Sequence, residues 1–160
     1  MRRLTLVRRI AARPSIVFEA MTTAEGVAAW WGCGPGEVPI VSAEIDARVG
    51  GAYRVHFRTL DGQDHEVCGE YLEFVPPRRV VMSWRWAFGG EPDEHGRTSR
   101  LEIDLAPTAE GTELTFTHAE LWSEASEKSH SWGWTGSLDR LVRHVERAGA
   151  PATLTTENPT

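Results

Sequence analysis

The sequence predicts an α+β fold in which a long C-terminal helix covers one face of a curved antiparallel sheet of about seven strands. From about residue 40 to 119, apolar and polar residues alternate with the period of two that is typical of strands. Helix signals stand on both sides of this block, at residues 14–32 and 123–148. Strands joined by short turns pair antiparallel, and a sheet with one apolar face needs a cover.

The N-terminal segment predicts one strand and two short helices. Residues 3–10 alternate as a strand, and Pro14 is well placed in the first turn of a helix. Thr22 followed by Glu25 fits a capping box, which predicts that a second helix opens there and ends near Trp31. Two short helices should therefore lie between the first strand and the rest of the sheet.

Turn signals divide the central block into six strands. Asp61-Gly62 is a strong hairpin signal, Pro76-Pro77 is a weaker break, and Glu110-Gly111 is another tight turn. Gly50-Gly51 at a strand opening indicates a kink or bulge that curves the sheet. The predicted strands are 40–46, 51–59, 64–74, 79–87, 98–106 and 111–119.

The alternation also assigns the two faces of the sheet. Charged residues such as Arg54, Arg58 and Asp104 fall on the wet face. The apolar face carries Tyr53/Val55/Phe57, Val80/Met82/Trp84/Trp86, Leu101/Ile103/Leu105 and Leu114/Phe116/His118. The cover is the helix predicted over 123–148, whose apolar stripe consists of Trp134, Leu138, Leu141 and Val145.

The ends of this helix carry their own signals. Ser123 can cap its start and Gly149 stops it. We expect residues 1–149 to form a single domain and residues 150–160, which lack apolar periodicity, to form a mobile tail.

Composition and charge exclude several functions. The 160 residues are 41% hydrophobic and 25% charged, which is ordinary globular usage, and the formal net charge is −6 with a pI of about 5.5. Nucleic-acid binding needs a clustered positive field, so we expect none. No apolar run approaches the roughly 20 residues of a spanning helix, and no signal peptide is visible. We therefore expect no membrane insertion and a cytoplasmic location.

The residues also give no indication of a metal or cofactor. Cys33 and Cys68 have no metal-ligand spacing, and the six histidines are scattered without HxxxH or HxH patterns. The sequence lacks a P-loop, a GxSxG elbow and a GxGxxG motif followed by a helix. We expect no metal and no cofactor.

Local motifs, in their order along the chain, resemble a known superfamily. The segments are VFEAMT after Pro14 through Trp30-Trp31-Gly32, RVGGAYR at 48–54, CGEYLEFVPPRRVVMSW at 68–84, LTFTHAEL at 114–121 and GWTGSLDRLVRHVE at 133–146. The chain from about residue 3 to 148 resembles the SRPBCC (START-like, birch-pollen-allergen-like) helix-grip superfamily. Within it, the sequence is most similar to the activator of heat-shock protein 90 ATPase homologue family.

The resemblance implies a cavity between the long helix and the concave sheet. Across the superfamily such cavities hold lipids, polyketides and other apolar molecules, and the resemblance implies no single reaction. Seven tryptophans are unusual for this length and suit a cavity with amphipathic walls. The expected ligand-binding residues are Trp31, Tyr53, Phe57, Met82, Trp84, Trp86, Phe116, His118, Trp134 and Leu138, although periodicity alone cannot separate cavity lining from solid core.

Two titratable residues are candidates for catalysis. His118 falls on the inward face of the last strand, and Glu70 lies where the alternation is blurred around Gly69. His118 also fits a buried imidazole satisfied by its neighbours, or a polar anchor for a ligand. These patterns leave both residues as candidates and assign neither to catalysis.

Three functions therefore remain open. The first is binding of a small hydrophobic molecule, as a carrier or sensor. The second is a cyclase or dehydratase-type enzyme that uses the same cavity, and the third is a chaperone-associated interaction module. Few polar residues fall on the inward face, which favours binding over catalysis. The ligand's identity, a protein partner and a homodimer are left open.

Overall fold

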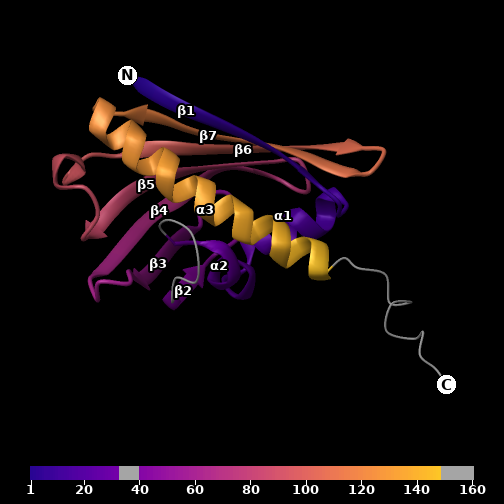
Figure 1. Ribbon diagram of the computed structural model, residues 1–160, viewed down its shortest axis with the longest axis horizontal. Helices are drawn as coiled ribbons and strands as arrows, with labels where there is room; N and C mark the ends of the chain where they lie inside the picture. Colours follow the sequence, from indigo (N-terminus) through magenta and orange to yellow (C-terminus); the bar gives the residue numbers. More distant parts are fainter. Residues whose placement is uncertain (33–39, 149–160) are drawn as a thin grey trace.

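The computed structural model describes residues 1–32 and 40–148 of the chain. Its elements follow the order β1, α1, α2, β2 to β7, α3 (Figure 1). The strands are Arg2–Ile10 (β1), Ile40–Ile45 (β2), Ala52–Arg58 (β3), Asp64–Val75 (β4), Arg79–Phe88 (β5), Ser99–Thr108 (β6) and Gly111–Leu121 (β7). The α-helices are Pro14–Thr22 (α1), Ala24–Trp30 (α2) and Glu124–Ala148 (α3), and a 3₁₀ turn covers Pro92–Glu94.

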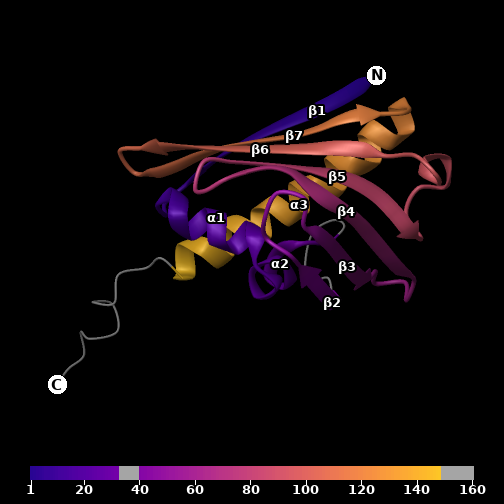
Figure 2. The same cartoon turned by 180° about the vertical axis from the view of Figure 1, so that it is seen from behind.

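The seven strands form one antiparallel sheet with the order β1-β7-β6-β5-β4-β3-β2. Every neighbouring pair except β1 and β7 is consecutive in the chain, and the connections between these strands range from the tight β6–β7 turn to the longer β5–β6 segment that contains the 3₁₀ turn. The long helix α3 crosses one face of the sheet, and the opposite face stays uncovered (Figures 1 and 2). The predicted α+β helix-grip fold is confirmed.

The apolar faces meet as the alternation predicts. On β3, Tyr53, Val55 and Phe57 are buried while Arg54 and Arg58 are exposed. On α3, the stripe Trp134, Leu138, Leu141 and Val145 is buried in the same core cluster. Ser123 Oγ accepts a hydrogen bond from the backbone N–H of Ser126, which caps the helix as expected.

The cap of the second helix is the one local sequence signal that needs correction. The predicted cap of the second helix at Thr22 is wrong: Thr22 closes α1, and Thr23 Oγ1 accepts from the N–H of Gly26. The two threonines are adjacent, so the sequence pattern could not tell which hydroxyl faces the open amides. Gly50 has a φ of 81°, which is the kink predicted before β3.

Some expectations fall outside the described residues, namely those on Cys33, on Gly149 and on the tail 150–160. No helix in the described ranges is long and apolar enough to cross a membrane. Among the same residues, no group of three or more His, Cys, Asp or Glu side chains is arranged to hold a metal ion.

Candidate functional site

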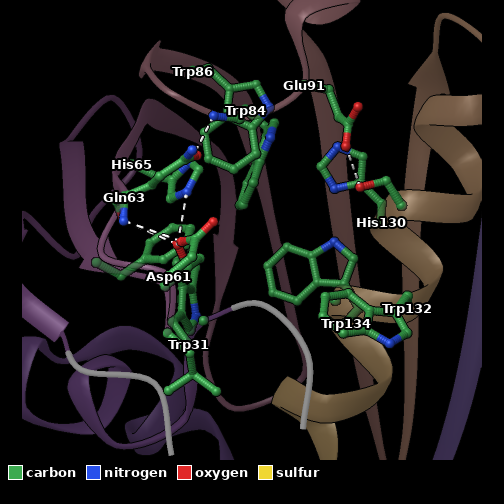
Figure 3. Close-up of a pocket in the computed structure, with 17 residues that line it drawn as sticks. Trp31, Asp61, Gln63, His65, Trp84, Trp86, Glu91, His130, Trp132 and Trp134 are labelled. Carbon is green, nitrogen blue, oxygen red and sulfur yellow. Dashed lines mark hydrogen bonds between the residues drawn. The ribbon is translucent and has the colours of Figure 1, made fainter.

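A cavity of about 570 Å³ lies between the first half of α3, the β3–β4 hairpin and β5. Figure 3 shows Asp61, Gln63 and His65 of the hairpin region on one side, and His130, Trp132 and Trp134 of α3 on the other. The described lining residues are Trp31, Gly32, Phe57, Thr59, Leu60, Asp61, Gln63, His65, Trp84, Trp86, Gly90, Glu91, Ser129, His130, Trp132, Gly133 and Trp134. This volume falls within the range of small-molecule sites.

Indole rings form most of the apolar wall. Trp84 is central: its ring centroid lies 5.6 Å from that of Trp31, 5.4 Å from Trp86 and 5.1 Å from Trp134. These four side chains are buried, whereas Trp132 is 61% exposed and stands at the mouth. Interlocked rings of this kind are stiff, so the wall is held in shape before any ligand enters.

Glu94 organises the polar end of the site. The residue is 5% exposed, and its carboxylate accepts hydrogen bonds from Trp86 Nε1 at 3.1 Å and Ser126 Oγ at 2.5 Å; both carboxylate oxygens lie 3.0 Å from His130 Nε2. Glu94 belongs to the turn after β5, while Ser126 and His130 belong to α3. The carboxylate therefore fastens the β5–β6 connection to the helix.

The charge state of Glu94 follows from these donors. Burial alone would raise the pKa of this carboxyl, but the hydrogen bond and charge of His130, with the hydrogen bonds from Ser126 and Trp86, outweigh burial and lower the pKa. Glu94 is therefore an ionised acceptor at neutral pH. A carboxylate cannot donate, so the facing Nε2 of His130 carries a proton.

His118 is the buried neighbour of this network. Its Nδ1 accepts from Trp134 Nε1 at 3.0 Å, and because an indole can only donate, the proton of His118 sits on Nε2 and is donated to Ser99 Oγ at 2.7 Å. Burial, with a smaller contribution from the nearby His130, places the pKa of His118 well below its ordinary value. His118 is therefore a neutral imidazole whose two nitrogens are satisfied.

On the opposite wall, His65 ties the hairpin to the β5–β6 connection. Its Nδ1 accepts from the backbone N–H of Gly90 at 2.8 Å, and its ring stacks on Phe57. Burial lowers the pKa of His65 despite the raising effect of Asp61. Gly90 has a φ of 73°, and a Cβ there would lie 2.1 Å from the ring of Trp86, so only glycine fits against that wall.

The structure divides the ten expected ligand-binding residues into two groups. The lining group is Trp31, Phe57, Trp84, Trp86 and Trp134. The other group is buried but absent from the lining: Tyr53, Met82, Phe116, His118 and Leu138. Tyr53 illustrates this second group, because its hydroxyl donates to the carbonyl of Ser83 at 2.5 Å and burial raises its pKa.

The fold does not bring the two catalytic candidates together. Glu70 is exposed on the uncovered face of the sheet, where it lines a separate hollow with Arg54 and Arg85. His118 points to the other face and is 0% exposed.

Sequence reasoning missed the pair His130 and Glu94. His130 precedes Trp134 by four residues and extends the apolar stripe of α3 by one turn, which is a signal that could have found it. Glu94 had no such signal, since it lies in a polar segment without periodicity.

A helix-grip fold with a cavity between its long helix and its sheet defines a ligand-binding type of domain in general terms. The family model described as Activator of Hsp90 ATPase homolog 1-like protein matches residues 11–146. The chain belongs to this family, as the motifs of the sequence indicated. No curated protein matches the chain at a significant level.

Solved structures from several bacteria are similar to this chain. A protein from Chromobacterium violaceum is 30% identical with a TM-score of 0.77, covering 90% of this chain and 97% of its own. The AHSA1 protein from Silicibacter pomeroyi is 25% identical with a TM-score of 0.78, covering 92% and 99%. The AHSA1-like protein from Aeromonas hydrophila, 19% identical with a TM-score of 0.70 over 99% of both chains, shares the fold.

Proposed function

We propose that this protein binds a small, largely apolar aromatic molecule in the cavity between α3 and the sheet, as a carrier or sensor. The observation that carries the proposal is the wall of five tryptophans, Trp31, Trp84, Trp86, Trp132 and Trp134, around a space of about 570 Å³. Flat indole faces bind flat apolar rings through dispersion and offset stacking.

The size of the cavity sets the expected affinity. A ligand of about 20 heavy atoms with about 0.3–0.4 kcal/mol per atom gains about 6–8 kcal/mol, which corresponds to a Kd from tens of micromolar to about 1 µM. Hydrophilic metabolites should bind far more weakly, because the indoles offer them few partners.

Two exposed tryptophans provide a matched pair for the test. Trp132 lines the mouth of the cavity, whereas Trp122, 52% exposed, lies outside it with the Arg97 guanidinium stacked 3.4 Å from its ring centroid. Calorimetric titration with flat aromatic probes should give saturable binding to the wild type. Trp132→Ala should weaken it about 3- to 10-fold, as loss of one stacking face implies, and Trp122→Ala should leave it unchanged.

Fluorescence gives a second readout of the same site. Trp84→Ala removes the central indole and should weaken the fluorescence response beyond the loss of one fluorophore, with Trp122→Ala again as control. A broad screen without saturable binding, or equal loss in the Trp132 and Trp122 variants, would overturn the proposal.

A further inference from the structure

The polar side of the cavity contains His130, and the carboxylate of Glu94 fixes which of its ring nitrogens carries the hydrogen. Glu94 is an ionised acceptor with three donors directed at it, from Trp86, Ser126 and His130. The Nε2 atom of His130 therefore carries the hydrogen, and in the neutral imidazole Nδ1 is left with a lone pair. Orientation of a histidine by a carboxylate is a common way to prepare its other nitrogen for a partner.

The Nδ1 atom of His130 has no hydrogen-bond partner among the described residues and is still open to its surroundings. The buried side-chain atoms without a hydrogen-bond partner in the described ranges are Trp31 Nε1, Trp84 Nε1, His56 Nε2 and Arg100 Nε, and Nδ1 of His130 is not among them. His130 lines the cavity, and Figure 3 shows its ring reaching from α3 toward the strand side.

Two carboxylates of the cavity lining are also hydrogen-bond acceptors. Glu91 Oε1 accepts from Ser129 at 2.6 Å, and Asp61 accepts from the hydroxyl of Thr59 and from the N–H of Gln63. The hydroxyl hydrogens of Ser129 and Thr59 are therefore already donated within the protein. No lysine or arginine occurs among the described lining residues, so no permanent positive charge faces the two carboxylates.

We propose that the ligand is an uncharged aromatic molecule that carries a hydrogen-bond donor, a phenol-like hydroxyl, which it donates to Nδ1 of His130. This inference rests on the proposed function and adds the chemical class of the ligand. A carboxylate ligand is selected against, because it would bring a third negative charge to Asp61 and Glu91 and would present acceptors to acceptors.

Three naphthalenes of similar shape test this class in the wild-type protein. Calorimetry at about pH 8 compares 2-naphthol, 2-methoxynaphthalene and 2-naphthoate. The naphthol donates a hydrogen bond, the methoxy compound only accepts, and the naphthoate is an anion. We expect 2-naphthol to bind about 10-fold more tightly than 2-methoxynaphthalene, as expected for one hydrogen bond to a desolvated acceptor, and 2-naphthoate to bind most weakly.

A matched pair of histidine variants assigns the preference to His130. His130→Phe keeps a ring against Trp86, on which His130 stacks, but removes Nδ1. The affinity ratio of 2-naphthol to 2-methoxynaphthalene should fall from about 10 in the wild type to about 1 in this variant. His56→Phe makes the same exchange outside the cavity, next to Phe88, and should keep the full preference.

Each outcome separates this inference from the proposed function. Equal binding of naphthol and methoxynaphthalene, or tightest binding of naphthoate, would overturn the donor inference while a flat-ring site stands. Absence of binding for all three, together with failure of the wider aromatic screen, would end the proposed function as well. If His130→Phe does not fold, the wild-type order of the three probes decides the question.

Discussion

Replacing Glu94 by Gln tests whether this carboxylate fastens the β5–β6 connection to α3. The carboxylate receives hydrogen bonds from Trp86, Ser126 and His130 in a site that is 5% exposed. The amide of Gln offers one acceptor oxygen and one NH₂ group. The amide oxygen can still accept from Trp86 and His130, as Oε1 does in the wild type, but the NH₂ group takes the place of Oε2, which accepts from Ser126 and lies 3.0 Å from His130.

The expected cost follows from the lost charge and the lost second acceptor oxygen. Hydrogen bonds to a charged group contribute about 1.5–3 kcal/mol, and a buried donor without a partner costs about 1–3 kcal/mol. Because Ser126 can rotate its hydroxyl to accept from the NH₂, we expect Glu94→Gln to lower the free energy of unfolding by about 2–4 kcal/mol at pH 7.

The pH dependence of this loss has a definite sign. The pKa of Glu94 is lowered in the folded state, so the unfolded chain takes up the proton first as the pH falls. The contribution of the carboxylate is complete above the unfolded value of about 4.3 and is lost as the pH falls through the lower folded value. The stability difference between wild type and Glu94→Gln should therefore shrink in that acid range.

Urea denaturation from pH 7 down to about pH 3 measures this difference. Glu91→Gln is the control, since Glu91 precedes the same turn but has one hydrogen bond, from Ser129, at the cavity rim. It should change stability by less than about 1 kcal/mol. A Glu94→Gln cost equal to that of Glu91→Gln, or one that does not vary with pH, would refute the role given to Glu94.

Three further predictions concern the core, the buried imidazole and the cavity wall. Leu138→Ala should cost about 2–5 kcal/mol, because Leu138 is 0% exposed on the buried side of α3, and an unchanged urea midpoint would contradict this. His118→Gln should cost about 1–3 kcal/mol at pH 7. Since the pKa of His118 is lowered, wild-type stability falls as the pH drops below about 6.5, and the gap to the Gln variant should narrow there; a constant gap in urea titrations would argue against a neutral His118. Gly90→Ala adds a clash with Trp86 to its backbone strain, whereas Gly62, with φ of 87°, has nothing within 4 Å of its Cβ position. Thermal melts should show a loss larger by about 1–3 kcal/mol for Gly90→Ala than for Gly62→Ala, and equal losses would exclude the contact.

The arrangement of elements could be predicted because it depends on short-range patterns. The predicted strand 79–87 appears as Arg79–Phe88, and the helix predicted over 123–148 appears as Glu124–Ala148. Period-two alternation and helical stripes record which face of each element is buried, and tight turns record which strands are neighbours. One adjacent-residue ambiguity, between Thr22 and Thr23, gave the one wrong cap.

The site was less predictable because it depends on depth and on long-range contacts. Tyr53 and Phe57 share one face of β3 and are equally buried, yet Phe57 alone lines the cavity. The alternation of apolar and polar residues shows which face of a strand is buried. It does not show at which point along the strand a space opens between the sheet and the helix. The bond between Glu94 and His130 joins residues 36 positions apart, and neither residue's neighbours in the sequence indicate the other.

The central claim, that aromatic molecules bind between α3 and the sheet, is tested most directly by the indole N–H signals of the seven tryptophans in ¹⁵N NMR spectra. Saturating 2-naphthol should shift the signals of Trp31, Trp84, Trp86, Trp132 and Trp134, which line the cavity, and leave that of Trp122, outside it, in place. Shifts confined to Trp122, or spectra that do not change for any tryptophan, would contradict the claim.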